Sequence, residues 1–209
     1  MEPDAVEMRV LGCLIEKQHT TPGAYPLTLN SLRLACNQAT NRDPVVDFDE
    51  TTIRGALERL GRRKWTRMAS WSSGRSMKYR HMLGESLSLS EAELAVLGVL
   101  MLRGAQTPGE LKQRTERMHA FAGDDLQLTL DRLAERELVG PLGRRAGQRE
   151  PRYEQRLGGA EGAAEPSEPG PAPEYGPAAP EGDDRLARIE SELAELREQV
   201  RALRAELGS

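Results

Sequence analysis

Basic side chains gather where a helical pattern is followed by two short strand patterns. Between residues 49 and 63, Ile53, Leu57 and Leu60 follow the i, i+4, i+7 spacing of a helix that buries one face. The opposite face and the segment after it carry polar and basic residues that could contact a polyanion: Thr51, Arg59, Arg62, Arg63, Lys64, Arg75, Lys78 and Arg80. Because guanidinium and ammonium groups neutralise phosphates, this pattern is typical of a nucleic-acid contact.

Arg59 and Arg62 are the members of this set that we expect to reach base edges, because arginine pairs bidentately with guanine. Glu58 lies in the middle of the same face and would repel phosphate. An ordinary solvated helix face is therefore the alternative to a DNA contact.

The sequence lacks the residue patterns that catalysis or metal binding would require. The residues His19, His81 and His119 stand in no metal-ligand spacing with cysteine or carboxylate residues. The sequence contains no P-loop, nucleophile elbow or dinucleotide-binding motif. Cys13 lies in an apolar run and Cys36 at an expected helix end, so we expect packed thiols, with a redox sensor as the weaker alternative. We expect no enzyme, metal or cofactor.

A weak internal repeat organises the elements that carry these residues. The stretch VLGCL at residues 10–14 is similar to VLGVL at 96–100, and TPG occurs at both 21–23 and 107–109. The apolar stripe of the helix at 49–63 has a counterpart in Leu126, Leu130 and Leu133. Because the order is the same in both parts, we interpret the chain as two copies of one module of about 75 residues.

Each copy is predicted to contain three helices followed by two short strands. The first copy has helices at about 4–18, 28–37 and 49–63 and strands at 65–71 and 76–82. In the second copy, Ser90 with Glu93 and Thr107 with Glu110 form capping boxes that open two helices, and a third runs from about 124 to 137. Strands are expected at 138–142 and 152–157.

Three helices and a hairpin in this length predict a winged-helix domain, in which the third helix usually enters the major groove and the hairpin contacts the backbone or minor groove. The expected fold class is therefore mainly α with small β-hairpins (α+β). Its parts are a winged-helix domain at 4–83 and a second one at 86–157.

Several motifs resemble the YceH-like family of bacterial proteins. They are LIEKQ at 14–18, TTP at 20–22, YPL at 25–27, ACNQ at 35–38, TNRDPV at 40–45 and LRGAQTPGEL at 102–111. The resemblance spans about residues 4–157. It implies a tandem winged-helix fold of unsettled biochemical role, often followed by a C-terminal coiled coil, and it supplies no catalytic residues to carry over.

The second copy presents a different face from the first. Its third helix directs Leu128, Asp131, Arg132 and Glu135 outward, which suits a protein contact or solvent better than a major groove. Its hairpin is basic, so a contact of that hairpin with a nucleic-acid backbone is the alternative; the basic residues are Arg144, Arg145, Arg149 and Arg152.

The polar loop of the first copy, at 35–45, is expected to lie between the second and third helices. Its side chains Asn37, Gln38, Asn41 and Arg42 form a dense hydrogen-bonding group. A capped turn in which these side chains satisfy backbone groups is the favoured interpretation, and a ligand-binding loop is the alternative.

The segment 158–184 is predicted to be a disordered acidic linker. Of its 27 residues, twelve are glycine or proline, seven are acidic and none is basic. A polyproline-type ligand for another domain is the alternative interpretation.

A short coiled-coil helix is predicted at 185–207, because apolar residues follow a heptad spacing. These residues are Leu186, Ile189, Leu193, Leu196, Val200, Leu203 and Leu207. Its charge pattern favours a parallel arrangement and leaves the number of strands open. Self-association is favoured over docking of this helix on its own domain.

Composition sets the remaining limits. The chain has 209 residues and a net charge of −4, which divides into +4 for residues 1–83, −1 for 84–158 and −7 for 159–209. The first part could therefore face a polyanion although the whole is acidic. No apolar run approaches the roughly 20 residues of a membrane span, and the N-terminal residues lack a signal-peptide pattern. We expect a cytoplasmic protein without membrane contact.

These observations lead to one main hypothesis and one rival. The main hypothesis is a bacterial protein that binds double-stranded DNA, acts in transcription regulation and associates with itself through the coiled coil. The rival is a protein-interaction scaffold of the type of the chromosome-segregation protein ScpB, with a protein partner at the second domain and no direct DNA readout.

The heptad segment generates the first test. Leu196→Asp places a charge in the predicted seam and should abolish self-association while leaving the rest of the chain folded. Sedimentation of the full-length protein over a range of concentrations measures the change. Ser191→Asp, which lies outside the a and d positions, is the matched control and should associate normally. Equal assembly of wild type, Leu196→Asp and a 1–157 truncation would contradict the prediction.

Overall fold

The computed structural model describes residues 2–69, 77–142 and 150–158, which belong to one compact unit, residues 1–165. Arg75, the remainder of the predicted linker from 159, and the heptad segment 185–207 lie outside the described residues. Within the described part, seven α-helices and two small antiparallel sheets form the mixed architecture that the sequence predicts in outline.

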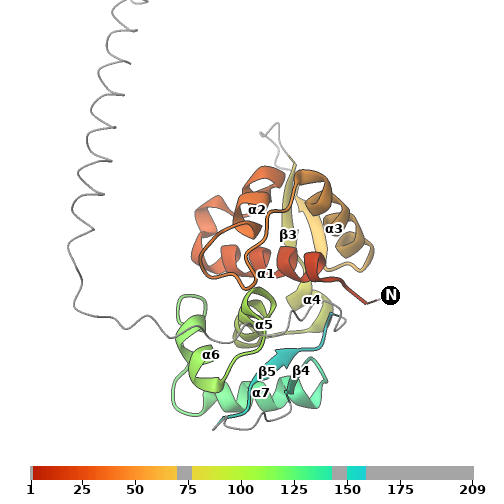
Figure 1. Cartoon of the computed structure of the whole chain (residues 1–209). Coiled ribbons are helices and arrows are strands. Elements are labelled where there is room, and N and C mark those ends of the chain that lie inside the picture. The colour runs from red at the N-terminus through yellow and green to blue at the C-terminus, as the bar shows by residue number, and fades with distance from the viewer. Residues whose placement is uncertain (1, 70–76, 143–149, 159–209) are drawn as a thin grey trace, which may run out of the picture. The chain divides into compact units, whose positions relative to one another are not determined.

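The first half begins with α1 (Ala5–Thr20) and a 3-10 turn, η1 (Pro22–Ala24). It continues with β1 (Leu27–Thr28), α2 (Leu29–Cys36) and α3 (Glu50–Arg62). The strands β2 (Thr66–Ala69) and β3 (Lys78–His81) follow, and the antiparallel sheet has the order β1-β3-β2 (Figure 1). Met68 pairs with Tyr79 and Leu27 pairs with Tyr79 from the other side, so β3 is the central strand.

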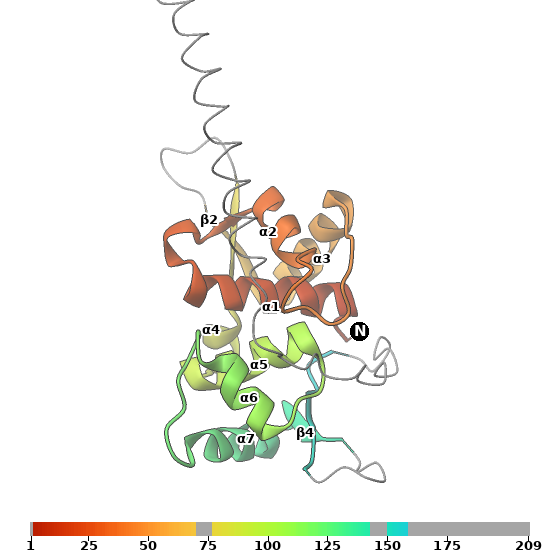
Figure 2. The same cartoon turned by 60° about the vertical axis from the view of Figure 1, so that its left-hand side comes forward.

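The second half repeats the helices and one hairpin. A short helix, α4 (Leu83–Leu87), leads into α5 (Glu91–Arg103), α6 (Pro108–Thr115) and α7 (Asp125–Glu135). The strands β4 (Val139–Pro141) and β5 (Tyr153–Gln155) form a two-stranded antiparallel sheet (Figure 2). Among these helices, as in the first half, each is too short or too polar to span a lipid bilayer.

Local capping signals set the helix ends as the sequence predicts. Asp49 accepts a hydrogen bond from the Thr52 N–H group and begins α3, while Ser90 and Thr107 form complete capping boxes with Glu93 and Glu110. A further capping box, between Asp4 and Glu7, begins α1. The elements β1, η1 and α4 were not predicted, since each is too short to carry a periodic apolar pattern.

The core is centred on α1 and α5, which pack against each other. Residues 7–15 of α1 and 93–102 of α5 are all buried, so neither helix has a solvent-facing side over these stretches. Helices that are covered on every side lie inside a core. The predicted modules at 4–83 and 86–157 therefore meet through their first helices in a shared apolar core.

Two glycines let these helices approach closely. A Cβ atom built on Gly12 would lie 3.0 Å from Cβ of Met101, and one built on Gly98 would lie 3.1 Å from Cγ2 of Ile15. Met101 occupies in the second repeat the position that Ile15 occupies in the first. The contact is therefore reciprocal: each glycine faces the equivalent side chain of the other repeat.

Enlarging Gly12 should separate the two helices. Gly12→Val should lower the free energy of unfolding by about 1–3 kcal/mol, because added carbons would overlap Met101 and Leu102 in a packed core. Urea unfolding of the full chain measures the change. Gly55→Val is the control, because a Cβ there has only the terminal nitrogen of Arg59 as a neighbour, at 3.4 Å. Equal stability of the Gly12 and Gly55 variants would contradict the close packing.

Candidate nucleic-acid interface

The outward face of α3 carries two arginines and one glutamate. Thr51, Arg54, Glu58 and Arg62 are exposed, at spacings of three and four residues, while the opposite face packs into the core. Helix α3 is in contact with β2. Arg54 was not among the predicted residues, although it is exposed on this face.

The prediction for Arg59 needs a correction, because its guanidinium forms ion pairs with carboxylates of the first half. Its Nη2 lies 2.6 Å from Oδ2 of Asp4, and its Nε lies 3.1 Å from Oε2 of the buried Glu7. Burial alone would lower the pKa of Arg59, but the two carboxylates raise it above the usual value. Arg59 therefore clamps α3 to the start of α1, and Arg54 and Arg62 replace it as candidates to reach a base edge.

Arg63 also faces Glu7, although less closely. Its Nε lies 3.7 Å from Oε1 of Glu7, and its guanidinium carbon lies 5.7 Å from the centre of the Trp65 ring. This position over an aromatic face is typical of a cation–π contact. Arg63 thus contributes to the contact between α3 and α1 and is also partly exposed.

The turn after α3 adds exposed cations next to Arg62. Lys64 adopts a left-handed conformation, with φ of 63°, and its N–H group donates to the Gly61 carbonyl. Arg67 is exposed on β2. Within the described residues, the side chains of Arg54, Arg62, Lys64 and Arg67 form no ion pair.

The hairpin strand β3 pairs with β2 and is also tied to Tyr25. The Tyr25 hydroxyl accepts a hydrogen bond of 2.8 Å from the His81 N–H group. Burial raises the pKa of Tyr25 to about 12, and burial with the nearby charges of His19 and Arg80 lowers the pKa of His81 to about 4. Both side chains are therefore uncharged at neutral pH. Lys78 and Arg80 are half-buried on this strand, and Arg80 lies 3.8 Å from Glu85.

The second half presents the mixed face that the sequence predicts. Leu128 is 57% exposed on α7, and Asp131, Arg132 and Glu135 are exposed beside it. Arg152 is engaged elsewhere, since it donates to the Ala105 carbonyl at 2.8 Å and pairs with Glu110 at 3.1 Å. The other three basic residues predicted for this hairpin lie outside the described residues.

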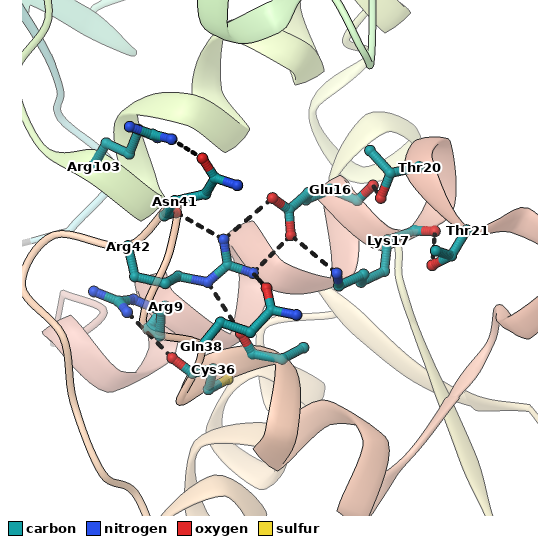
Figure 3. A network of polar contacts seen from close by, with 11 residues as sticks. Arg9, Glu16, Lys17, Thr20, Thr21, Cys36, Gln38, Asn41, Arg42 and Arg103 are labelled. Atoms are coloured by element: carbon teal, nitrogen blue, oxygen red, sulfur yellow. Dashed lines mark hydrogen bonds and ion pairs between the residues drawn. The ribbon is translucent and has the colours of Figure 1, made fainter. Parts of the chain in front are cut away.

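The polar loop between α2 and α3 is built around a buried arginine. Figure 3 shows the Arg42 guanidinium surrounded by oxygen atoms. It forms two hydrogen bonds to the Glu16 carboxylate, at 3.1 and 2.6 Å, and one to Gln38 at 2.9 Å. Its remaining bonds go to the Ala35 and Asn41 carbonyls, at 3.0 and 2.8 Å. All five N–H groups of the guanidinium thus have partners.

These contacts agree with the predicted capped turn. The Asn37 side chain accepts from the Phe48 N–H group and donates to the Phe48 carbonyl, which closes the loop. Burial would lower the pKa of Arg42, but its hydrogen bonds to Glu16 raise it above the usual value. Cys13 and Cys36 are both fully buried, which confirms the expectation of packed thiols.

A comparison with known families now identifies the chain. The family model described as "Protein of unknown function, DUF480" matches residues 4–157. The chain belongs to the DUF480 family. This result confirms the resemblance to YceH-like proteins, and the match covers both repeats.

DUF480 relatives occur in several bacteria. A UPF0502 protein of Pelobacter propionicus is 49% identical over 205 residues, which cover 95% of this chain and 91% of the relative. The UPF0502 protein YceH of Salmonella newport is 43% identical over 215 residues, covering 99% of this chain and 98% of the relative. The similarity to both relatives extends over nearly their whole length, including the part beyond the family match.

Arg42 is the residue of the loop whose loss should cost most. Arg42→Met should lower the free energy of unfolding by about 3–5 kcal/mol, because the largely buried Glu16 carboxylate would lose its partner. The double variant Arg42→Met, Glu16→Leu should recover part of this loss, since no buried charge is then left unpaired. Denaturant unfolding measures both.

Arg54→Met, on the exposed face of α3, is the control and should change stability by less than about 0.5 kcal/mol. A small effect of Arg42→Met, similar to that of the control, would show that the network contributes little to stability.

Proposed function

We propose that the two repeats are tandem winged-helix domains and that the first binds double-stranded DNA through α3 and the β2–β3 hairpin. The observation that carries the proposal is the group of four cations, Arg54, Arg62, Lys64 and Arg67, which form no ion pair among the described residues. They lie on α3, on the turn after it and on β2, which are adjacent elements. Such a surface suits a row of phosphates.

The charges along α3 indicate which end faces the DNA. Asp47, Asp49 and Glu50 lie at or just before the N-terminus of α3, and Glu58 is exposed in its middle. These carboxylates would repel phosphate, so the contact centres on the last turn of α3, around Arg62, and on the hairpin. Backbone phosphates therefore supply most of the affinity, and sequence selectivity is modest.

The proposal is for a binding protein rather than an enzyme. A role in transcription regulation follows if DNA is bound in the cell. Self-association through the heptad segment would place several DNA-binding faces in one particle, which raises the apparent affinity without any new contact.

A protein-interaction scaffold is the second candidate, and the exposed Leu128 on α7 favours it. An apolar side chain that is 57% exposed among Asp131, Arg132 and Glu135 suits the centre of a small protein contact with a polar rim. The two functions are compatible, because α7 and α3 belong to different halves of the chain.

Titration of a labelled duplex with the full-length protein tests the DNA proposal. The logarithm of the wild-type binding constant should fall linearly with the logarithm of the salt concentration. The slope should be about −0.9 for each phosphate contact. Arg62→Ala with Lys64→Ala should weaken binding at least about tenfold and reduce the slope by roughly 2.

The matched control is Lys112→Ala with Arg132→Ala, which removes the same charge from exposed positions on α6 and α7. This control pair should bind almost as wild type does. If both pairs weaken binding equally, the proposed location is wrong. If wild type shows no salt-dependent binding, DNA is not the partner and the scaffold is favoured.

A further inference from the structure

A second group of basic residues lines a cavity of about 370 Å³. Five segments form its wall: the end of α1, the loop after α2, α5, α6 and the turn after α6. Arg103, Arg114 and Arg117 contribute their side chains, and Val99, Leu102 and Met118 provide an apolar surface. The volume lies within the range of small-molecule sites.

The positive charge of this cavity is not balanced by its own carboxylate. Glu16 is the acidic residue in the wall, but both of its oxygens already accept from Arg42 and its Oε2 also lies 3.7 Å from Nζ of Lys17. Arg114 has only a distant contact with Glu110, at 3.7 Å. Arg117 is exposed and forms no ion pair with a described residue.

Arg103 is held in place by an uncharged partner. Its guanidinium donates to Oδ1 of Asn41, as Figure 3 shows. Asn41 itself adopts a left-handed backbone conformation, with φ of 60°, at the tip of the loop. Burial, together with the charges of Arg114 and Arg42, lowers the pKa of Arg103. Arg103 is thus held in the wall by a neutral amide, and Arg117 has no carboxylate partner among the described residues.

We propose that this cavity binds a small organic phosphate monoester. Arginine is well suited to phosphate, because its planar group donates two parallel hydrogen bonds to the oxygens. The half-buried Met118 lines the cavity with the arginines and would contact the organic part of the ligand, whereas Val99 and Leu102, which also line it, are almost fully buried. Polar side chains of Thr20, Asn41 and Gln113 complete the wall.

The ligand would contact both halves of the chain. Thr20 and Asn41 belong to the first half, whereas Arg103 and Arg117 belong to the second. Binding would therefore strengthen the association of the halves and raise the stability of the folded chain by mass action. This inference does not rest on DNA binding, because the cavity shares no residue with the α3 surface.

Calorimetric titration of the full-length protein with AMP, pyrophosphate and adenosine tests the proposal. AMP serves as a probe that carries a phosphate monoester and a flat organic part, and adenosine is its uncharged counterpart. AMP should bind saturably at one site, pyrophosphate more weakly, and adenosine not measurably. Saturating AMP should also raise the thermal midpoint.

Arg117→Ala and Arg103→Gln should each weaken AMP binding about tenfold or more, since each removes a charge-assisted hydrogen bond. Arg117 is exposed, so its variant should fold even if Arg103→Gln does not. Lys112→Ala removes an equal charge from α6 outside the cavity and should change AMP affinity less than about twofold.

Three results would overturn the proposal. One is the lack of saturable binding of AMP and pyrophosphate up to about 10 mM, which corresponds to a negligible affinity. Another is an equal loss in Arg117→Ala and Lys112→Ala, which would show unspecific attraction. The third is a loss of duplex affinity in Arg117→Ala with unchanged AMP binding, which would assign the cavity to nucleic acid.

Discussion

The close packing of α1 against α5 is the constraint on which the rest of the structure depends. Both helices are buried on all sides over their central residues, so each must be covered by elements of both halves. Gly12 and Gly98 set the distance between them, because neither position leaves room for a larger side chain. The other helices, the two sheets and the loop then take positions around this pair.

Several charged groups near this core join elements to one another. Arg42 fixes the loop to α1 through Glu16, and Arg59 fixes α3 to the start of α1 through Asp4 and Glu7. Because a buried ion that lacks a partner is costly, these pairs also define which arrangement of the elements is stable. The two proposals rest on cations outside these pairs, at the end of α3 and around the cavity.

Helix positions could be predicted closely from the sequence because their signals are local. The apolar stripe of Ile53, Leu57 and Leu60 and the cap at Asp49 lie within one helix, and the observed α3 differs from the predicted one only at its capping residues. Side-chain partners could not be predicted in the same way. Arg59 meets Asp4 across 55 residues of sequence and Arg42 meets Glu16 across 26, so a helical wheel placed Arg59 in solvent.

The cavity could not be predicted from the sequence either, because its arginines come from α5, α6 and the turn after α6. One signal was nevertheless present. The repeated stretches at 10–14 and 96–100 contain the two glycines of the α1–α5 contact, and a glycine at the same place in two apolar helices suggests that the helices touch there. The repeat thus indicated that the module is duplicated, and its two glycines marked the surface at which the copies meet.

The reciprocity of that contact gives the chain the interface of a twofold symmetric dimer within a single polypeptide. Gly12 faces Met101 and Gly98 faces Ile15, as equivalent residues do across an isologous interface. The short connection through α4 keeps the two partners at a local concentration of the order of millimolar or higher. Dilution therefore does not separate the halves, and their pairing does not require the diffusional encounter of two subunits.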